Sequence, residues 1–213
     1  MTLKLYYTFG TCALASHITL IEAGADYELQ RISFKDEEQK KPEYLKLNPK
    51  ARVPSLVTPE GVLTETPALL VYIAQKFPAK NLALIDDPFA FAKVQEFNSY
   101  LCSTAHINHA HRMRGYRWVD ANDEHSIKAM QKKVPESVAA AFELIEQYML
   151  KGPYVMGDRF TVCDPYLFTL SQWLEDDGVD LARLPRVAEF RARLSERPSV
   201  QRALAEQTKK VAA

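Results

Sequence analysis

No stretch of this 213-residue chain approaches the roughly 18 consecutive apolar residues that a transmembrane helix requires. Neither sign of charge is in excess: 27 lysines and arginines match 27 aspartates and glutamates, so the formal net charge is zero. Internal repeats and low-complexity segments are also absent. This balance gives no reason to expect nucleic acid or an anionic membrane as a partner.

Cysteine is scarce, and the three that occur, Cys12, Cys102 and Cys163, lie far apart. None has the close spacing of a zinc site, so we expect no metal. An odd number of cysteines in a chain of this length fits a reducing compartment better than a disulfide framework. The apolar start is interrupted by tyrosines, threonines and a glycine, so it lacks the core of a signal peptide. We therefore expect a cytoplasmic protein.

The first 24 residues hold the most informative segment. Residues 3–8 predict a short apolar strand, residues 9–11 a turn, and Cys12 the start of a helix that ends at Gly24. At such a turn the helix dipole and unpaired N–H groups stabilise a thiolate, so we expect the pKa of Cys12 to be lowered. A resolving cysteine three residues on is absent, because Ala15 stands there. The natural redox partner would be an external thiol such as glutathione, although a buried packing cysteine is the alternative.

The order of elements after this helix predicts a thioredoxin-like domain. Residues 27–34 predict a second strand that completes a βαβ unit, and residues 42–48 a short helix. Residues 52–57 and 62–65 predict a hairpin, and Thr66-Pro67 opens a helix that reaches Phe77, with Thr66 as its cap. The resulting order, βαβ followed by ββα, places Cys12 at the first strand-to-helix turn.

Beyond this part the pattern changes to helices alone. We expect domain boundaries at 1–78 and 89–213, with a turn-rich linker at 79–88. From Phe89 onward the apolar residues recur at helical spacing, with a last helix over 185–205 that Pro198 interrupts and a tail holding Lys209 and Lys210. The predicted fold is a small α/β domain of the thioredoxin-like type followed by an all-α domain.

Four patches of sequence resemble the glutathione S-transferases, and most closely the bacterial beta-class members that use cysteine. The patches are Leu5-Tyr-Tyr-Thr-Phe-Gly-Thr-Cys-Ala-Leu-Ala-Ser-His17, Asn48-Pro-Lys-Ala-Arg-Val-Pro-Ser-Leu56, Leu63-Thr-Glu-Thr-Pro-Ala-Leu-Leu-Val-Tyr-Ile73 and Val155-Met-Gly-Asp-Arg-Phe-Thr-Val-Cys-Asp-Pro-Tyr-Leu-Phe168. With the two-domain organisation, the resemblance covers nearly the whole chain.

The resemblance implies a role for each matching residue. Cys12 matches the cysteine that faces the sulfur of glutathione. Val53 matches the residue whose backbone pairs with the peptide part of glutathione, and Pro54 the cis-proline of the family. Glu65 and Thr66 match the residues that hold the γ-glutamyl end, a carboxylate for its ammonium and a helix N-terminus for its carboxylate.

Further candidates come from both halves. Arg52, Tyr7 and Thr11 complete the predicted glutathione-binding set. In many relatives a tyrosine or serine hydroxyl activates the thiol of glutathione. Side chains alternate between the two faces of a strand, so only one of Tyr6 and Tyr7 can face the cleft. His106 matches a histidine that reaches the thiol from the helical domain. The family usually has a charged residue near it, where this chain has Thr104 and Ile107.

The segment from His106 to Trp118 is rich in histidine and arginine and has three interpretations. A metal site would need converging ligands, yet on a helix His111 points roughly 140° from His106. A nucleic-acid patch fits poorly with a neutral chain. The third interpretation is the cationic rim of a substrate cleft. Cys102, four residues before His106, also allows a Cys–His pair.

These residues predict a glutathione transferase that uses glutathione as co-substrate, and the resemblance to the bacterial members implies a detoxification enzyme and a homodimer. It would transfer the thiol to a small hydrophobic electrophile or exchange disulfides through Cys12, with His106 as an acid, base or thiolate partner. The alternative is a non-catalytic module on the same fold that binds glutathione or docks a protein.

Overall fold

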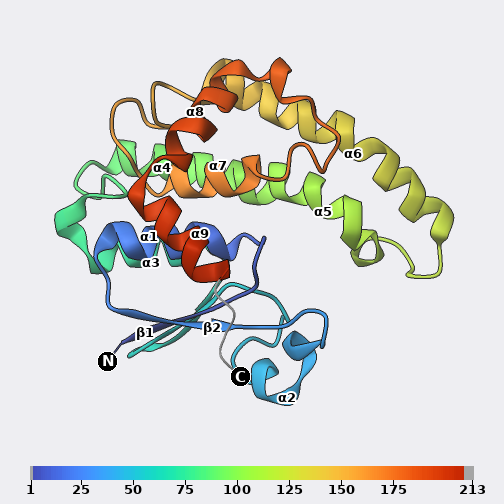
Figure 1. Cartoon of the computed structure of the whole chain (residues 1–213), viewed down its shortest axis with the longest axis horizontal. Helices are drawn as coiled ribbons and strands as arrows, with labels where there is room; N and C mark the ends of the chain where they lie inside the picture. Colours follow the sequence, from blue (N-terminus) through green and yellow to red (C-terminus); the bar gives the residue numbers. More distant parts are fainter. Residues whose placement is uncertain (1, 209–213) are drawn as a thin grey trace.

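The computed structural model describes residues 2–208 and divides into a sheet-containing N-terminal part and a helical remainder (Figure 1). Figure 1 shows the sheet in the lower part of the molecule, with α1 and α3 above it, α9 beside α1, and most of the other long helices above those. The predicted tail at Lys209-Lys210 lies outside the described residues. Within residues 2–208, no helix is both long and apolar enough to cross a membrane.

The four strands form one mixed sheet in the spatial order β2-β1-β3-β4. β1 runs parallel to β2, with Leu3 opposite Tyr27, and antiparallel to β3, which pairs with β4 as a hairpin. The predicted βαβ and ββα order is therefore confirmed, although the first three strands are shorter than predicted and the fourth is shifted by one residue. The strands are β1 Leu3–Tyr7, β2 Tyr27–Arg31, β3 Ser55–Thr58 and β4 Gly61–Thr64.

The helices follow the sequence signals for their starts and ends. Gly24 ends α1 in the left-handed region, with φ of 69°, which a glycine adopts without steric cost. Pro198 divides the predicted last helix in two, because proline cannot continue an α-helix. The helices are α1 Ala13–Ala23, α2 Pro42–Leu45, α3 Thr66–Lys76, α4 Pro88–Tyr100, α5 His106–Arg114, α6 Glu124–Leu144, α7 Cys163–Ser171, α8 Pro185–Ser195 and α9 Pro198–Thr208.

A π-helical segment, Leu101–Ala105, joins α4 to α5 immediately before His106. Such wide turns occur often beside functional sites, because one extra residue redirects the side chains that follow. The helical spacing that the sequence shows from Phe89 onward therefore changes register at this segment.

The predicted linker is also more firmly packed than its turn-rich sequence suggests. Leu82 and Ala83 are buried, and the Leu82 carbonyl accepts a hydrogen bond from the Val162 N–H at 2.8 Å.

One apolar core runs through both parts of the chain, from Leu3 and Leu56 in the sheet to Phe142, Phe168 and Phe190 in the helices. Because this core is continuous, the helical part fixes the position of the sheet and of the turn that carries Cys12.

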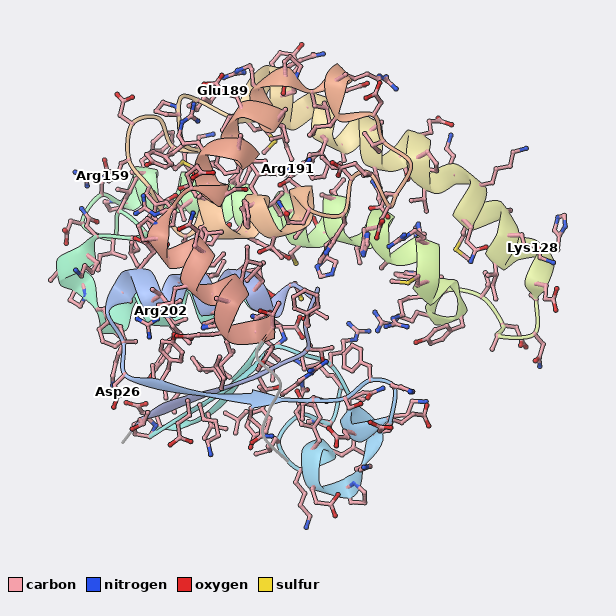
Figure 2. All side chains as sticks on the ribbon, viewed as in Figure 1. Asp26, Lys128, Arg159, Glu189, Arg191 and Arg202 are labelled. Atoms are coloured by element: carbon pink, nitrogen blue, oxygen red, sulfur yellow. The ribbon has the colours of Figure 1, made fainter. Side chains whose placement is uncertain are left out.

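The last helix returns to the N-terminal part and packs against α1 (Figure 1). His17 of α1 is fully buried; its Nε2 lies 3.0 Å from Glu206, and its Nδ1 lies 3.3 Å from the side-chain amide of Gln207. Arg202 of α9 lies low on this helix, above the sheet (Figure 2), and its guanidinium is 5.8 Å from the ring centroid of Tyr27. The two parts are therefore joined by polar contacts as well as by the core.

Candidate active site

Cys12 lies at the boundary between the β1–α1 turn and α1, as the sequence predicts, and is almost fully buried. Its Sγ is 3.7 Å from the carbonyl oxygen of Val53, to which the thiol donates. The turn and the loop before β3 are 41 residues apart in sequence, and they meet because β1 and β3 are neighbours in the sheet. The fold thus brings together two of the residues that the resemblance singles out.

The expected lowering of the Cys12 pKa is wrong. The pKa of the thiol is raised from 9.0 to about 11, chiefly because burial deprives a thiolate of hydration. The negative charge of Glu65 acts in the same direction, and a hydrogen bond from Thr66 acts against it. The helix N-terminus does favour a thiolate, as the sequence predicts. The sulfur is nevertheless buried so deeply that desolvation raises the pKa by more than the helix dipole lowers it.

The loop that carries Val53 is fixed by buried polar groups. The hydroxyl of Tyr44 and the side-chain amide of Asn48 donate to the carbonyl oxygen of Arg52 at 2.6 and 2.7 Å, and the Val53–Pro54 peptide bond is cis, as the resemblance implies. Because two side chains donate to the Arg52 carbonyl oxygen, this loop is held in a single conformation. The Val53 carbonyl is therefore presented next to Cys12 in a defined direction.

Glu65 and Thr66 lie at the start of α3. Glu65 is the N-cap residue, with φ of 73°, and Thr66 is the first helical residue. The predicted capping role of Thr66 is therefore wrong by one position, and neither side chain caps the helix. The buried Thr66 hydroxyl instead lowers the pKa of Cys12 through a hydrogen bond. The Glu65 carboxylate is exposed and pairs with the Nζ of Lys50 at 2.5 Å.

Tyr7 and Thr11 lie close to Cys12 in sequence, but their side chains have structural partners. The Tyr7 ring is buried in a small cluster with Ala13, Ile32, Tyr44 and Val53. The Thr11 hydroxyl donates to the Thr8 carbonyl at 2.6 Å, which closes the turn before α1. Their assignment to the glutathione site stays a prediction.

His106, the first residue of α5, lies beside Tyr166 of α7. The Nδ1 of His106 is 3.3 Å from the Tyr166 hydroxyl. Burial lowers the pKa of His106 to about 4, and the neighbouring groups His109, Arg117 and Arg52 act in the same direction. At neutral pH the ring is therefore uncharged and carries one N–H.

Tyr166 is the residue that His106 contacts in the helical part, and its helix α7 packs against α1, the helix that begins after Cys12. Burial holds the pKa of Tyr166 well above its ordinary value, and ionisation of Cys12 or Cys102 would raise it further. Tyr166 follows the helical spacing of a core residue, and nothing in the sequence distinguishes it as part of a site.

The sequence also gives no sign of the partners of the other histidines. His109 contacts the buried carboxylate of Asp177, 68 residues away, whereas His111 packs on Trp118 with ring centroids 4.5 Å apart. His111 therefore turns away from His106, as its helical angle predicts. Among the described residues, no group of three or more histidine, cysteine or acidic side chains forms a metal-binding cluster.

In the predicted cationic rim, Arg114 is the last residue of α5 and Arg117 follows it; Arg52 of the N-terminal part, which the prediction did not include, adds a third charge near them. In Figure 2, nitrogen-tipped side chains gather below the end of α5, on the side that faces the N-terminal part. The pKa of Arg117 is lowered by partial burial and by the neighbouring charges of Arg52 and Arg114. Within residues 2–208 none of these three arginines pairs with a carboxylate, which leaves their charge available to an anion.

Two surface hollows lie away from Cys12. One, of about 440 Å³, is lined by Lys80, Arg159 and Arg197 among others, and the second, of about 260 Å³, by Tyr6, Arg31 and Tyr44. In the first, the Arg197 guanidinium already binds Glu22 at 2.6 and 2.7 Å and covers the ring of Phe160 at 4.0 Å. These contacts join α1 to the helical part, so we assign this hollow a structural role.

Comparison with known proteins identifies the class. Residues 1–75 match the glutathione S-transferase N-terminal domain family, and residues 110–207 match the corresponding C-terminal domain family. The chain is 31% identical over 206 residues to glutathione S-transferase GstA of Escherichia coli O157:H7, covering 95% of this chain and 97% of that protein. The chain therefore belongs to the glutathione S-transferase family.

Solved structures agree over almost the full length. A glutathione transferase homologue from Sulfitobacter with bound glutathione is 42% identical with a TM-score of 0.92, covering 96% of this chain and 98% of that one. The bacterial beta-class enzyme of Sphingomonas chungbukensis is 28% identical with a TM-score of 0.83 and the same coverage. The predicted fold and the predicted glutathione transferase activity are confirmed, in preference to the non-catalytic module.

Proposed function

We propose that this glutathione transferase conjugates glutathione to small hydrophobic electrophiles, with Cys12 acting as a protonated hydrogen-bond donor to the glutathione sulfur. The observation that carries this proposal is the raised pKa of the buried Cys12, which keeps the thiol neutral at physiological pH. A neutral S–H donates to a thiolate and so favours ionisation of glutathione rather than of Cys12. The glutathione sulfur then forms the new C–S bond, and the leaving group departs with the bonding electron pair.

The N-terminal part supplies the proposed glutathione ligands. The backbone of Val53 would pair with the peptide of glutathione as a neighbouring strand does. Glu65 would bind the γ-glutamyl ammonium, while Thr66, at the N-terminus of α3, would bind its carboxylate. Arg52 precedes Val53 on the loop before β3, and within residues 2–208 its guanidinium pairs with no carboxylate. It would bind the second carboxylate of glutathione, at the glycine end.

His106 would act from the helical part. Its ring is neutral, one nitrogen lies beside the Tyr166 hydroxyl, and within residues 2–208 the other nitrogen, Nε2, has no hydrogen-bond partner. A neutral N–H can donate to a thiolate without the cost of burying an imidazolium. His106 is therefore the second donor that we assign to the glutathione sulfur.

The deciding experiment compares Cys12→Ala and Cys12→Ser with the wild type in two assays: conjugation of a chlorodinitrobenzene, and exchange with the mixed disulfide of glutathione and hydroxyethanethiol. We expect Cys12→Ala to lower kcat for conjugation about tenfold, the equivalent of one hydrogen bond. Cys12→Ser, which restores a donor, should recover most of it.

The outcome also separates the two chemistries. If Cys12→Ala and Cys12→Ser both abolish turnover in both assays, the sulfur itself is the nucleophile, and thiol exchange through Cys12 replaces the donor role. Retention on immobilised glutathione without turnover of any electrophile would contradict the conjugation proposal.

The assembly and the location of the enzyme belong to the same proposal. Phe89 on α4 and Val62 on the edge strand β4 expose apolar side chains to water. A second copy of the chain in a homodimer would cover them and remove the free-energy cost of this exposure. Sedimentation of the wild type and of Phe89→Glu tests this, since the charged variant should dissociate. The three free thiols suit a cytoplasmic role in detoxification, which cell fractionation and survival under electrophile stress would test.

A further inference from the structure

Behind His106 lies a second cluster to which neither the comparisons nor the proposed mechanism gives a role. His109 is one turn further along α5, and Trp173 and Asp177 lie in the turns that follow α7. The Nδ1–H of His109 donates to both oxygens of Asp177, at 2.9 and 2.7 Å. The Nε of Arg112 lies 3.1 Å from the same carboxylate.

The carboxylate of Asp177 is the anchor of this cluster. Its side chain is only 2% exposed, so it has exchanged water for the imidazole of His109 and the guanidinium of Arg112, both on α5. A buried carboxylate is costly even when it is paired, and apolar side chains hold two helices together at less cost. Packing of α5 on the segment after α7 does not by itself account for this cost. The cost is explained if the site also requires the His109 imidazole to be held in one direction, which the bond to Asp177 does.

The aromatic rings carry this orientation toward His106. The His109 ring stacks on Trp173 with centroids 4.1 Å apart and planes 21° from parallel. The other neighbour of Trp173 is His106, at 5.3 Å and 49°. His106 is thus held between the indole of Trp173 and the Tyr166 hydroxyl at its Nδ1.

We propose that Asp177 is a positioning residue: through His109 and Trp173 it fixes the imidazole of His106 in the orientation that serves the glutathione sulfur. This inference rests on the proposed role of His106. Asp177 touches neither substrate nor reacting atoms, so its effect falls on kcat and not on the binding of glutathione.

Asp177→Asn tests the proposal, and Asp176→Asn is a matched control on the next residue, where the carboxylate is 73% exposed. We expect Asp177→Asn to lower kcat by roughly ten- to a hundredfold, as misplacement of a reacting group by about 1 Å does, with KM for glutathione within about twofold. Asp176→Asn should leave both constants unchanged. The imidazole NMR signals of His106 should shift in Asp177→Asn and not in the control.

Two substitutions of His109 keep the test valid if Asp177→Asn folds poorly. His109→Gln can still donate to Asp177 but cannot stack on Trp173, and His109→Phe can stack but cannot donate. Because the proposed path needs both contacts, each variant should lower kcat and shift the His106 signals.

The proposal is overturned if Asp177→Asn lowers the melting temperature alone, with kcat and the His106 signals unchanged; the cluster is then only a brace. His106→Ala separates the two levels of the argument. If it keeps full turnover, the proposed role of His106 fails and Asp177 has no reaction to serve. If His106→Ala loses turnover while Asp177→Asn does not, the positioning role alone is wrong.

Discussion

The protonation state of Cys12 gives the sharpest prediction, because structure and simple sequence reasoning disagree in sign. The pKa of its thiol is raised from 9.0 to about 11 by burial, so the thiolate is disfavoured by roughly 2.7 kcal/mol relative to an ordinary cysteine. At about pH 7.5 the ionised fraction falls from roughly 3% to roughly 0.03%, a hundredfold loss. Free Cys12 should therefore be a poor nucleophile.

Alkylation by iodoacetamide measures this directly. In Cys102→Ala, with peptide mass mapping to separate Cys12 from the buried Cys163, the rate at Cys12 should rise about tenfold per pH unit without a plateau up to about pH 10. Slow access to a buried sulfur scales the whole curve but does not move its midpoint, so the midpoint reports the pKa.

Removal of the Thr66 hydroxyl extends the test. Thr66→Val takes away the one side-chain hydrogen bond that lowers the Cys12 pKa, so its alkylation rate at fixed pH should fall further. A plateau below pH 9 in the parent would refute the reasoning, since it would mean that the field of the helix N-terminus outweighs desolvation.

Three further predictions concern other contacts. Lys50→Ala removes the ammonium that competes with glutathione for the exposed Glu65 carboxylate. In steady-state kinetics KM for glutathione should therefore fall, by no more than about threefold. A rise in KM would contradict the proposed role of Glu65. Asp164→Ala leaves two buried backbone N–H groups, those of Val155 and Thr161, without their acceptor, which should cost about 2–4 kcal/mol in urea unfolding; a loss below 1 kcal/mol would argue against a stabilising role for these two bonds. Burial alone would raise the pKa of Glu22, but its bonds, above all that to Arg197, lower it below 4.5. Its stabilising contribution is therefore present above pH 4.5 and lost as pH falls through the folded value, and Arg197→Met should unfold with a weaker acid dependence.

Local patterns sufficed for the N-terminal elements. The alternation in β1, the turn before Cys12 and Gly24 at the end of α1 are read from neighbouring residues, and Pro198 marks the break between α8 and α9 in the same way. That Cys12 and Val53 belong to one site came from the resemblance. The cis peptide bond at Pro54 came only from the resemblance.

The remaining features of the site depend on distances that no local pattern encodes. The bond from His109 to Asp177 spans 68 residues, and the pairing of Lys50 with Glu65 depends on how the hairpin meets the loop before it. The pKa of Cys12 depends on how deeply its sulfur is buried, which the whole core determines. An argument from the helix terminus alone therefore gave the wrong sign.

The contact between α9 and α1 has a consequence for the order in which the protein is made. His17 leaves the ribosome early, but Gln207, which meets its Nδ1, is synthesised 190 residues later. Until then the imidazole has the Tyr27 hydroxyl, 3.2 Å from its Nε2, within the N-terminal part, but it lacks both Glu206 and Gln207. The nascent N-terminal part is thus expected to remain incomplete during translation, and its final consolidation waits for the last helix to emerge.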